Sequence, residues 1–508
     1  PASSRPGGLK VKVGEPSQPS TTAAPPATTS TPGHGATIIM MPGTLSSKEL
    51  NLSSSKQKLA YKPWRHDEHI HEPCTNRFKA PTASPEHATD YNGVSLPDTC
   101  FFGEDEHHVF IIGDWGGVLY ALGKKTIPAD HRSALFGDHH RQFVVGADDV
   151  AQLNVAYWMS QRAGVSFPDY VLNMGDNFYW GGVTVKCGAP PASCNDVSGQ
   201  WRWVYESIYQ GVGLDLPQWL GVLGNHDFGG YMFTSGWDQA IAYTWTMAAP
   251  STGRWLTPAL YYSAKVRYSD FSVDYFFVDT NVFDAYESHA DPNHNLCSLL
   301  HNVQDDGATC GVQGPVSVEE CPRWFKRLWD AELAWLEHGL NESQAEWQVL
   351  VTHFPPEHGE KEWRRLVHEY GVDLFLAGHR HQQEVHYMED ENFLRPTPYF
   401  VSGGGGGITS EGVPDAEGLD DMYGFMDLTL TKKEFMIEAI SHGGQVRSTT
   451  CFRPRPRAPQ RHHRAPHGNV GRGHEGEEDD RPPHGLGSGG DSRTLHLAVG
   501  DPAMPRRP

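Results

Sequence analysis

The sequence lacks features that would point to two large classes of protein. Its 41 lysine and arginine residues are outnumbered by 62 aspartate and glutamate residues, and the formal net charge is −21. Binding to a phosphate backbone requires a basic face, so this charge argues against a nucleic-acid partner. No apolar stretch approaches the roughly 20 residues that a helix needs to cross a bilayer. We therefore expect neither nucleic-acid binding nor a transmembrane segment.

Cysteine pairs at the spacing of a zinc knuckle are absent too. The chain has eight cysteines, and none of them lies in a CxxC pair. The loop CGAPPASC, residues 187–194, is short enough for a disulfide to close, and Cys297, Cys310 and Cys321 cluster in one Gly- and Asp-rich segment. An even number of loop cysteines favours an oxidising compartment, with reduced thiols in a cytosolic enzyme as the alternative.

Two N-x-S/T sequons, at Asn51 and Asn341, agree with a secreted glycoprotein. Together with the cysteines they lead us to expect a secreted or lumenal protein, whether extracellular, lysosomal or vacuolar.

Composition divides the chain into a central domain and two tails. Residues 1–60 are rich in Ser, Thr and Pro, and residues 452–508 are of low complexity, so neither segment can bury a core. We expect both to be disordered and dispensable for chemistry. Residues 61–106 form an N-terminal extension, and residues 107–451 alternate apolar runs with helical patterns, as a folded domain does.

Five apolar runs in the central domain each stop abruptly at a polar cluster. They are VFIIGDWGG, YVLNMGDNFY, WLGVLGNHD, WQVLVTHFPP and VDLFLAGHRH, and their compositions predict strands buried on both faces. Helical patterns such as DVAQLNVAYWMSQRAG and RWFKRLWDAELAWLEHGL lie between several of them. Strands alternating with helices predict a largely parallel arrangement, in which ligands bind beyond the carboxyl ends of the strands. All five clusters are therefore expected at one edge.

The polar clusters supply candidate functional residues whose types fit together. Taken singly, each has a structural explanation, because Asp and Asn often cap helices and a lone His is commonly a core group. Five clusters at five strand ends are harder to explain in this way. Carboxylate, amide and phenolate oxygens with imidazole nitrogens suit Fe, Mn or Zn. The candidates are Asp114, Asp176, Tyr179, Asn225, His226, Asp227, His353, His379 and His381.

There are more candidate ligands than one metal can use. This surplus indicates two metals that share a bridging carboxylate. Two metals ~3.5–4 Å apart can hold a hydroxide and stabilise both the attacking and the leaving oxygen in an in-line displacement at phosphorus.

The series GDWGG, GDNFY, GNHD, VTHF and GHRH resembles the calcineurin-like metallophosphoesterase superfamily. The tyrosine in GDNFY narrows the resemblance to purple acid phosphatases, most closely the small, tartrate-resistant type. The resemblance covers roughly residues 107–450 and makes residues 107–451 the catalytic domain. It implies a four-layer α/β/β/α sandwich, in which two mixed sheets pack face to face between helices, with metals at one edge. The implied activity is hydrolysis of phosphomonoesters at acidic pH by a dinuclear metal-bound hydroxide.

The resemblance also implies two groups of metal ligands joined by one shared residue. Those of the first metal, Fe(III), would be Asp114, Tyr179 and His381. Those of the second metal, a divalent Fe, Zn or Mn, would be Asn225, His353 and His379. Asp176 would bridge both metals.

Three further residues receive catalytic roles from the resemblance. His226 would donate to the substrate phosphate or protonate the leaving group, and Asp227 would orient His226. PPEHG resembles a family stretch that places another histidine over the site, which would be His358, although the gap from His353 is shorter here. A phenol with a pKa near 10 is a poor ligand for a divalent ion in acid, whereas trivalent iron can deprotonate Tyr179 and give the purple colour.

Some features depart from the family pattern or leave alternatives open. Arg380 inside GHRH could help to hold phosphate or could point to solvent. The segment 284–323 is longer than in compact relatives and could alter substrate choice. GGGGG at 403–407 is not a phosphate-binding loop, because no Lys follows it, and is expected to allow tight turns beside the site.

The expected substrates are small phosphorylated molecules, with phosphoproteins as a further class. The rival enzymatic function on the same scaffold is a phosphodiesterase or nucleotide pyrophosphatase. The rival of another class is a non-catalytic, metal-binding secreted glycoprotein. The intact ligand set argues against this last reading.

Overall fold

The computed structural model describes the central part of the chain, all of it within the unit His71–Pro508. The predicted tail 1–60 lies outside the described residues, as does 456–508, which is most of the other tail. For the strands β4 (Val118–Ala121) and β5 (Lys124–Pro128), which pair with each other, only the backbone is described. The described ranges are 74–103, 106–121, 124–128, 141–189, 199–290, 292, 294–302 and 307–455.

Two mixed sheets form the centre of the fold, as the resemblance implies. The eight-stranded sheet has the order β1-β9-β10-β11-β12-β14-β13, with β2 paired to β9, and the seven-stranded sheet has the order β17-β16-β15-β3-β6-β7-β8. The strands of the first are β1 (Val94–Ser95), β2 (Thr99–Cys100), β9 (Tyr262–Arg267), β10 (Ser272–Phe277), β11 (Trp347–Val351), β12 (Leu374–Ala377), β13 (Gln383–His386) and β14 (Tyr399–Ser402). Those of the second are β3 (His107–Ile112), β6 (Tyr170–Asn173), β7 (Gln218–Gly221), β8 (Trp255–Leu256), β15 (Gly424–Leu430), β16 (Phe435–Ser441) and β17 (Val446–Phe452).

The parallel arrangement expected from the sequence holds for the strands that carry the polar clusters. β3, β6, β7 and β8 pair in parallel in one sheet, and β10, β11, β12 and β14 do so in the other. Hairpin-connected strands flank both blocks and are antiparallel. The five apolar runs become β3, β6, β7, β11 and β12.

Both faces of the polar-cluster strands are buried, which accounts for their continuous apolar runs. In β3, Val109 and Ile111 belong to the core between the two sheets, while Phe110 and Ile112 face the helical layer outside. In β11, Val349 is in the core between the sheets and Leu350 is in the cluster on the opposite face. Because successive side chains point to opposite faces of the sheet, each of these strands contributes residues to two cores.

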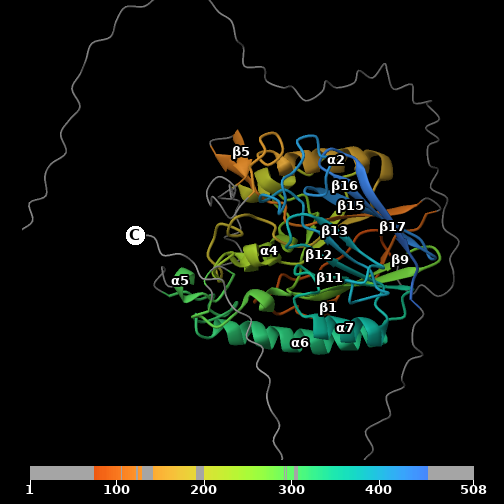
Figure 1. Ribbon diagram of the computed structural model, residues 1–508. Coiled ribbons are helices and arrows are strands. Elements are labelled where there is room, and N and C mark those ends of the chain that lie inside the picture. The colour runs from red at the N-terminus through yellow and green to blue at the C-terminus, as the bar shows by residue number, and fades with distance from the viewer. Residues whose placement is uncertain are drawn as a thin grey trace, which may run out of the picture. The chain divides into compact units, whose positions relative to one another are not determined.

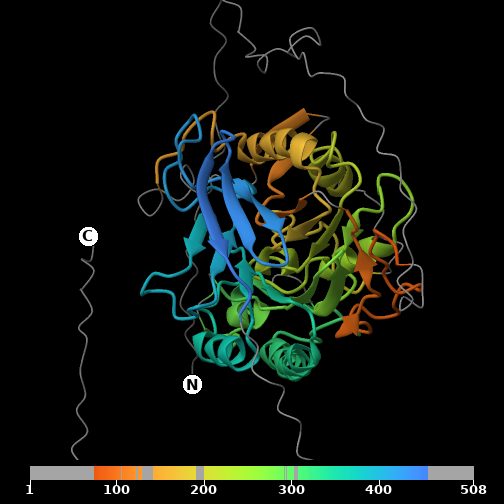
Figure 2. The same ribbon diagram turned by 90° about the vertical axis from the view of Figure 1, so that its right-hand side faces the viewer.

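Helices cover the outer face of each sheet (Figures 1 and 2). α6 and α7 cover the eight-stranded sheet through an apolar cluster that includes Leu336 and Leu366. α2, one of the two predicted helices, covers the seven-stranded sheet through residues such as Val155 and Met159. The α-helices are α2 (Ala151–Ser166), α3 (Asn225–Phe228), α4 (Trp237–Ala242), α5 (Leu299–Asn302), α6 (Cys321–Glu342) and α7 (Glu360–Tyr370). A π-helical turn spans Trp201–Glu206, and 3-10 turns span Tyr243–Trp245 and Asn281–Asp284.

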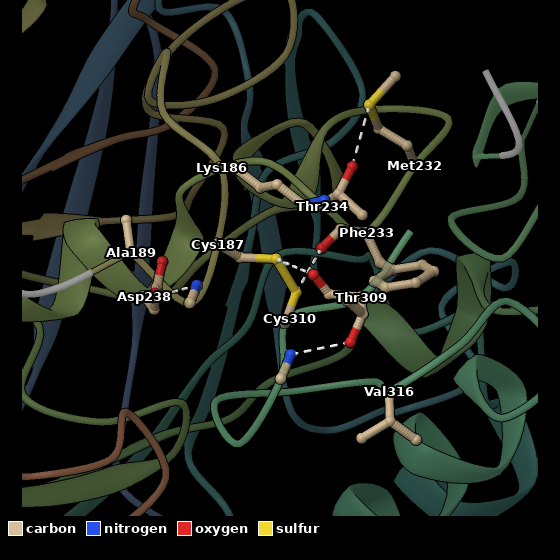
Figure 3. The surroundings of a disulfide bond; sticks show 12 residues. Lys186, Cys187, Ala189, Met232, Phe233, Thr234, Asp238, Thr309, Cys310 and Val316 are labelled. Atoms are coloured by element: carbon tan, nitrogen blue, oxygen red, sulfur yellow. Dashed lines mark hydrogen bonds between the residues drawn. A yellow bond between two sulfur atoms is a disulfide. The ribbon is translucent and has the colours of Figure 1, made fainter. Parts of the chain in front are cut away.

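Three disulfides join segments of the described chain: Cys74–Cys100, Cys187–Cys310 and Cys297–Cys321. The short loop 187–194 would allow a disulfide between its two cysteines, but Cys187 pairs instead with Cys310 of the 284–323 insertion (Figure 3). Cys194 lies outside the described residues, and among the described cysteines Cys451 is the one without a disulfide. Across the described ranges, we find no helix with the length and apolar character needed to span a bilayer.

The described chain extends slightly past the predicted domain limits on both sides. β1 and β2, from the predicted N-terminal extension, belong to the eight-stranded sheet. Phe452 is buried in the core between the sheets, and the Arg455 guanidinium donates to the carbonyls of Val367 and Val372.

Candidate metal centre

The ends of the predicted strands meet where the two sheets face each other. β3, β6 and β7 are neighbours in one sheet, and β11 and β12 are neighbours in the other. Nδ1 of His353, after β11, lies 2.8 Å from the Met174 carbonyl oxygen, after β6, and donates to it. The backbone N–H of His379, after β12, donates to Oδ2 of Asp114, after β3, at 3.0 Å. Polar clusters far apart in the chain therefore share one site.

The first donor group consists of Asp114, Asp176, Tyr179 and His381. One ligand atom from each of Asp114, Asp176 and His381 lies within 4.8 Å of the others, and all three side chains are buried. The Tyr179 hydroxyl is 2.7 Å from Oδ2 of Asp176, 3.0 Å from Oδ1 of Asp114 and 3.5 Å from Nε2 of His381. A carboxylate oxygen of Glu411 lies 3.4 Å from Nδ1 of His381, a contact that favours a proton on Nδ1 and makes Nε2 the atom that could bind a metal.

The second donor group lies on the other side of Asp176. Nε2 of His353 is 3.1 Å from Oδ1 of Asn225 and 3.4 Å from Oδ1 of Asp176. Since Nδ1 of His353 donates to a carbonyl, Nε2 of the neutral ring is an acceptor that faces two other acceptors. The His379 ring follows, with its centroid 5.2 Å from that of His353.

Asp284, the last residue of a 3-10 turn, is a buried carboxylate near this group. Burial, followed by the charge of Asp176, raises its pKa to about 7, against a lowering contribution from the Asn225 side chain. Sequence reasoning missed Asp284, because the stretch around it carries no motif of its own.

Backbone conformation singles out the same residues independently of their side chains. Asp114, Asp176 and His379 have φ angles of 57°, 53° and 70°, in the left-handed region that side chains disfavour. Among the described residues, Phe167, which ends α2, is the remaining non-glycine with positive φ. Such conformations cost on the order of 1–3 kcal/mol each and cluster at functional sites.

Glycines allow the donors to approach one another. A Cβ at Gly224 would lie 2.1 Å from Oδ1 of Asp176 and 2.6 Å from Cε1 of His353. A Cβ at Gly407 would lie 2.5 Å from the Tyr179 ring, and one at Gly403 would lie 1.9 Å from the Arg380 carbonyl oxygen. The glycine run 403–407 therefore makes the close turns beside the site that the sequence predicts.

The donor set fits metal cations. Asp114 and Asp176 are fully buried, and no lysine or arginine of the described chain lies within ion-pair distance of either carboxylate. Burial raises the pKa of Asp114 well above its ordinary value, and the neighbouring Asp176 raises it further. Burial, followed by these carboxylates, likewise raises the pKa of the Tyr179 phenol. Adjacent buried acids and facing acceptors are stabilised by a cation between them.

His226 stands at the edge of the donors, with a defined tautomer. Its backbone N–H donates to Oδ1 of Asp176 at 2.8 Å, and Nδ1 lies 2.6 Å from the Trp180 carbonyl oxygen. A carbonyl can only accept, so Nδ1 carries a proton and Nε2 is the nitrogen that can exchange one. Nothing in the sequence indicated that the Trp180 carbonyl would accept from His226.

In the described part of the chain, the Asp227 carboxylate hydrogen-bonds to two neighbouring loop segments. Its carboxylate accepts from the backbone and side-chain amides of Asn177 and from the backbone N–H of Gly224. Burial, followed by the charge of Asp176, raises its pKa to about 8. These bonds hold the GDNFY and GNHD loops together, and the predicted orientation of His226 by Asp227 remains a prediction.

His358 lies beside the second donor group, at a ring-centroid distance of 5.5 Å from His379. Burial and the nearby Arg380 lower the pKa of His358. Arg380 itself is 2.8 Å from Glu384 and 3.3 Å from Glu357. Its charge is thus paired with two carboxylates, an arrangement that the sequence did not indicate.

Known proteins resemble this chain over the part that carries the site. The family model described as calcineurin-like phosphoesterase matches residues 107–383. Tartrate-resistant acid phosphatase type 5 of Rattus norvegicus is 25% identical over 368 residues, which cover 68% of this chain and 90% of the rat protein. Purple acid phosphatase 17 of Arabidopsis thaliana is 26% identical over 261 residues, covering 49% and 62% of the two chains. The solved structure of GAP50, the anchor in the inner membrane complex of Plasmodium, aligns with a TM-score of 0.45 at 16% identity, covering 69% of this chain and 90% of that one.

Proposed function

Because the chain belongs to the calcineurin-like phosphoesterase family, we propose that it is an acid phosphatase that hydrolyses phosphomonoesters at a two-metal centre. Its similarity to tartrate-resistant and plant purple acid phosphatases supports this choice within the family. The sequence motifs, the donor chemistry and the positive-φ residues all point to the same edge of the sheets.

The position of Asp176 is the observation that carries the two-metal proposal. Its Oδ2 faces Tyr179 and its Oδ1 faces His353, so the carboxylate stands between the two donor groups. Fe(III) would be held by Asp114, Tyr179 and His381, and a divalent Fe, Zn or Mn by Asn225, His353 and His379. When bound, such metals acidify water to give a hydroxide nucleophile and stabilise charge on the phosphate oxygens.

His226 would serve the leaving group. With Nδ1 donating to Trp180, its Nε2 can hold a proton and deliver it to the departing oxygen. Asp176 accepts the backbone N–H of His226 and so fixes its distance from the donor set. His358, on the side of His379, would contact the substrate phosphate.

The proposed setting is secreted or lumenal. Three disulfides, two of them buried around the insertion, fit an oxidising compartment. The proposed substrates are small phosphomonoesters.

Metal analysis and hydrolysis of the purified protein test the proposal together. We expect about two metals per chain, one of them iron, a visible absorption band, and hydrolysis of a phosphomonoester near pH 5 in preference to a phosphodiester or a nucleotide pyrophosphate bond. Asp114→Ala should lose iron and activity, whereas Asp330→Asn, on the exposed face of α6, should keep both. Preference for the diester would favour the phosphodiesterase reading, and tightly bound metals without hydrolysis would favour a metal-binding glycoprotein.

A further inference from the structure

A row of rings leads away from the donor set on the side of His226. The Tyr179 and His226 ring centroids are 4.6 Å apart, and the His226 and Trp180 centroids are 4.4 Å apart. Trp180 is followed by Tyr231 at 5.4 Å, and Tyr231 by His301 at 5.1 Å. We call Trp180, Tyr231 and His301 the aromatic row.

The inner end of the row is fixed to His226. The Trp180 carbonyl accepts from Nδ1 of His226. Trp180 therefore sets the tautomer of the proposed proton donor, and its own ring packs beside that donor. Gly230 permits this packing, because a Cβ there would lie 3.0 Å from Nδ1 of His226 and 3.1 Å from Nε1 of Trp180. The next residue, Tyr231, is thereby placed against Trp180.

The outer end of the row comes from the insertion, which is anchored to the same loop as Tyr231. Asn302, next to His301 in α5, accepts the backbone N–H of Phe233 at 3.3 Å. The Asn302 amide also donates to the carbonyls of Leu296 and Ser298, which fixes the segment that leads into α5.

Two disulfides add covalent anchors to the insertion. Cys297 is bonded to Cys321 at the start of α6, and Cys310 to Cys187. Figure 3 shows the second of these bonds beside Phe233 and Thr234, and the backbone N–H of Cys187 donates to the Thr234 carbonyl at 3.0 Å. The segments that carry His301 and Tyr231 are therefore held together by hydrogen bonds and disulfides.

The three rings of the row are half-buried, so each keeps accessible surface. They also lie on one defined side of the reaction. In phosphomonoester hydrolysis the P–O bond to the alcohol breaks, water supplies the new oxygen of phosphate, and the departing oxygen takes the proton that His226 would deliver. The alcohol therefore leaves beside His226, whose ring is in contact with that of Trp180.

We propose that the aromatic row is a leaving-group subsite that favours phosphomonoesters whose alcohol carries a planar aromatic ring. This proposal rests on the proposed phosphatase function and names its substrate class. Aromatic side chains bind planar groups by offset or edge-to-face contact, with a gain beyond burial that corresponds to about 3- to 10-fold in binding. The ring could be attached directly to the phosphate oxygen, as in phosphotyrosine, or through a sugar, as in a nucleoside monophosphate.

Hydrolysis by the metal-loaded protein tests the subsite with three substrates: phosphotyrosine, a nucleoside monophosphate and glycerol phosphate. We expect kcat/KM for at least one aromatic substrate to exceed that for glycerol phosphate by about 3- to 10-fold or more. Tyr231→Leu and His301→Leu should reduce that ratio and leave kcat/KM for glycerol phosphate within about 2-fold. Leu300→Ala, an exposed neighbour on α5, is the matched control and should change neither. The aromatic substrate that loses its advantage in these variants, phosphotyrosine or the nucleoside monophosphate, identifies the kind of ring that the subsite binds.

Binding of phosphonates, which are not hydrolysed, separates the subsite from catalysis. Phenylphosphonate should bind more tightly than methylphosphonate by calorimetry, and Tyr231→Leu should abolish most of that difference without loss of metal. If the preference and its dependence on Tyr231 appear in binding while no substrate is hydrolysed, the subsite stands and the phosphatase proposal fails. Equal affinities for the two phosphonates, or equal losses on aromatic and glycerol substrates in Tyr231→Leu, would overturn the subsite.

Discussion

The Tyr179 hydroxyl lies 2.7 Å from Oδ2 of Asp176 and donates a hydrogen bond to it. With Asp114 at 3.0 Å, the phenol has two carboxylates as acceptors and one proton to share between them. Burial and the two acids raise the pKa of this phenol. Only a strong cation at this position would reverse that shift and make the oxygen a phenolate ligand.

Replacing Tyr179 with Phe tests the phenolate directly. The change removes one oxygen and keeps the ring that packs on His226. We expect the visible band of the iron-loaded protein to disappear or shift strongly, while the circular dichroism spectrum stays that of the wild type. A band of unchanged position and strength in Tyr179→Phe would show that the tyrosine does not bind the iron.

Asp176→Asn and Asn225→Ala together test the bridging assignment. Asp176 faces both donor groups, whereas the Asn225 side-chain oxygen lies beside His353 of the second group. We expect Asp176→Asn to lower occupancy of both metals and Asn225→Ala to empty chiefly the second. Metal analysis after dialysis is the measurement, and two fully retained metals in Asp176→Asn would rule out a shared carboxylate.

His226→Ala tests the proposed role of His226 as a proton donor. General acid help is typically worth ~10²–10⁴-fold, and it matters most for an alkoxide leaving group. The variant should therefore lose far more activity on an alkyl phosphate than on an activated aryl phosphate, with metal content nearly unchanged. Equal losses on both substrates would leave only phosphate binding for His226, and loss of metal would make it a ligand.

Glu332→Gln tests a pH effect on stability that arises away from the metal donors. Oε1 of Glu332, buried in α6, accepts the backbone N–H of Asp279, and Oε2 has no hydrogen-bond partner in the described part of the chain. Burial raises the pKa of Asp279 to about 7, and burial and Asp279 raise that of Glu332 well above its ordinary value. A raised carboxyl pKa means that the folded state holds protons that the unfolded state releases, so stability is full in acid and falls as pH rises through about 7.

We expect the melting temperature of the wild type to fall between pH 5 and pH 8. Glu332→Gln, which keeps an oxygen that can accept from Asp279, should reduce this fall by about 2–4 °C. Asp330→Asn, which changes an exposed carboxylate on the same helix, is the control and should leave the fall unchanged. Parallel pH profiles of Glu332→Gln and the wild type would contradict the assignment.

The strands, and the meeting of the polar clusters at one edge, could be predicted from the sequence because both depend on local pattern. An apolar run that ends in a polar cluster is visible in a single segment, and the parallel order of β3, β6 and β7 then brings the clusters together. Trp180 and His301 carry no such pattern, since their roles depend on which loops meet in space. The pairing of Arg380 with Glu357 has the same cause.

Disulfide connectivity shows the same limit most plainly. CGAPPASC offered a local partner for Cys187, yet its partner is Cys310, 123 residues away. Proximity in the chain favours a short loop, but the fold determines which sulfur atoms meet.

The connectivity has a consequence for how the chain can be made. The Cys187–Cys310 and Cys297–Cys321 bonds interleave, because Cys297 lies between the members of the first pair. During synthesis Cys194 and Cys297 both leave the ribosome before Cys310, so wrong partners for Cys187 are available first. Where a wrong bond has formed, reaching the native pairs requires thiolate attack on it, which takes seconds to hours depending on oxidant and isomerase. A host compartment that supplies a disulfide isomerase should therefore yield the native protein, whereas simple air oxidation should yield a mixture of isomers.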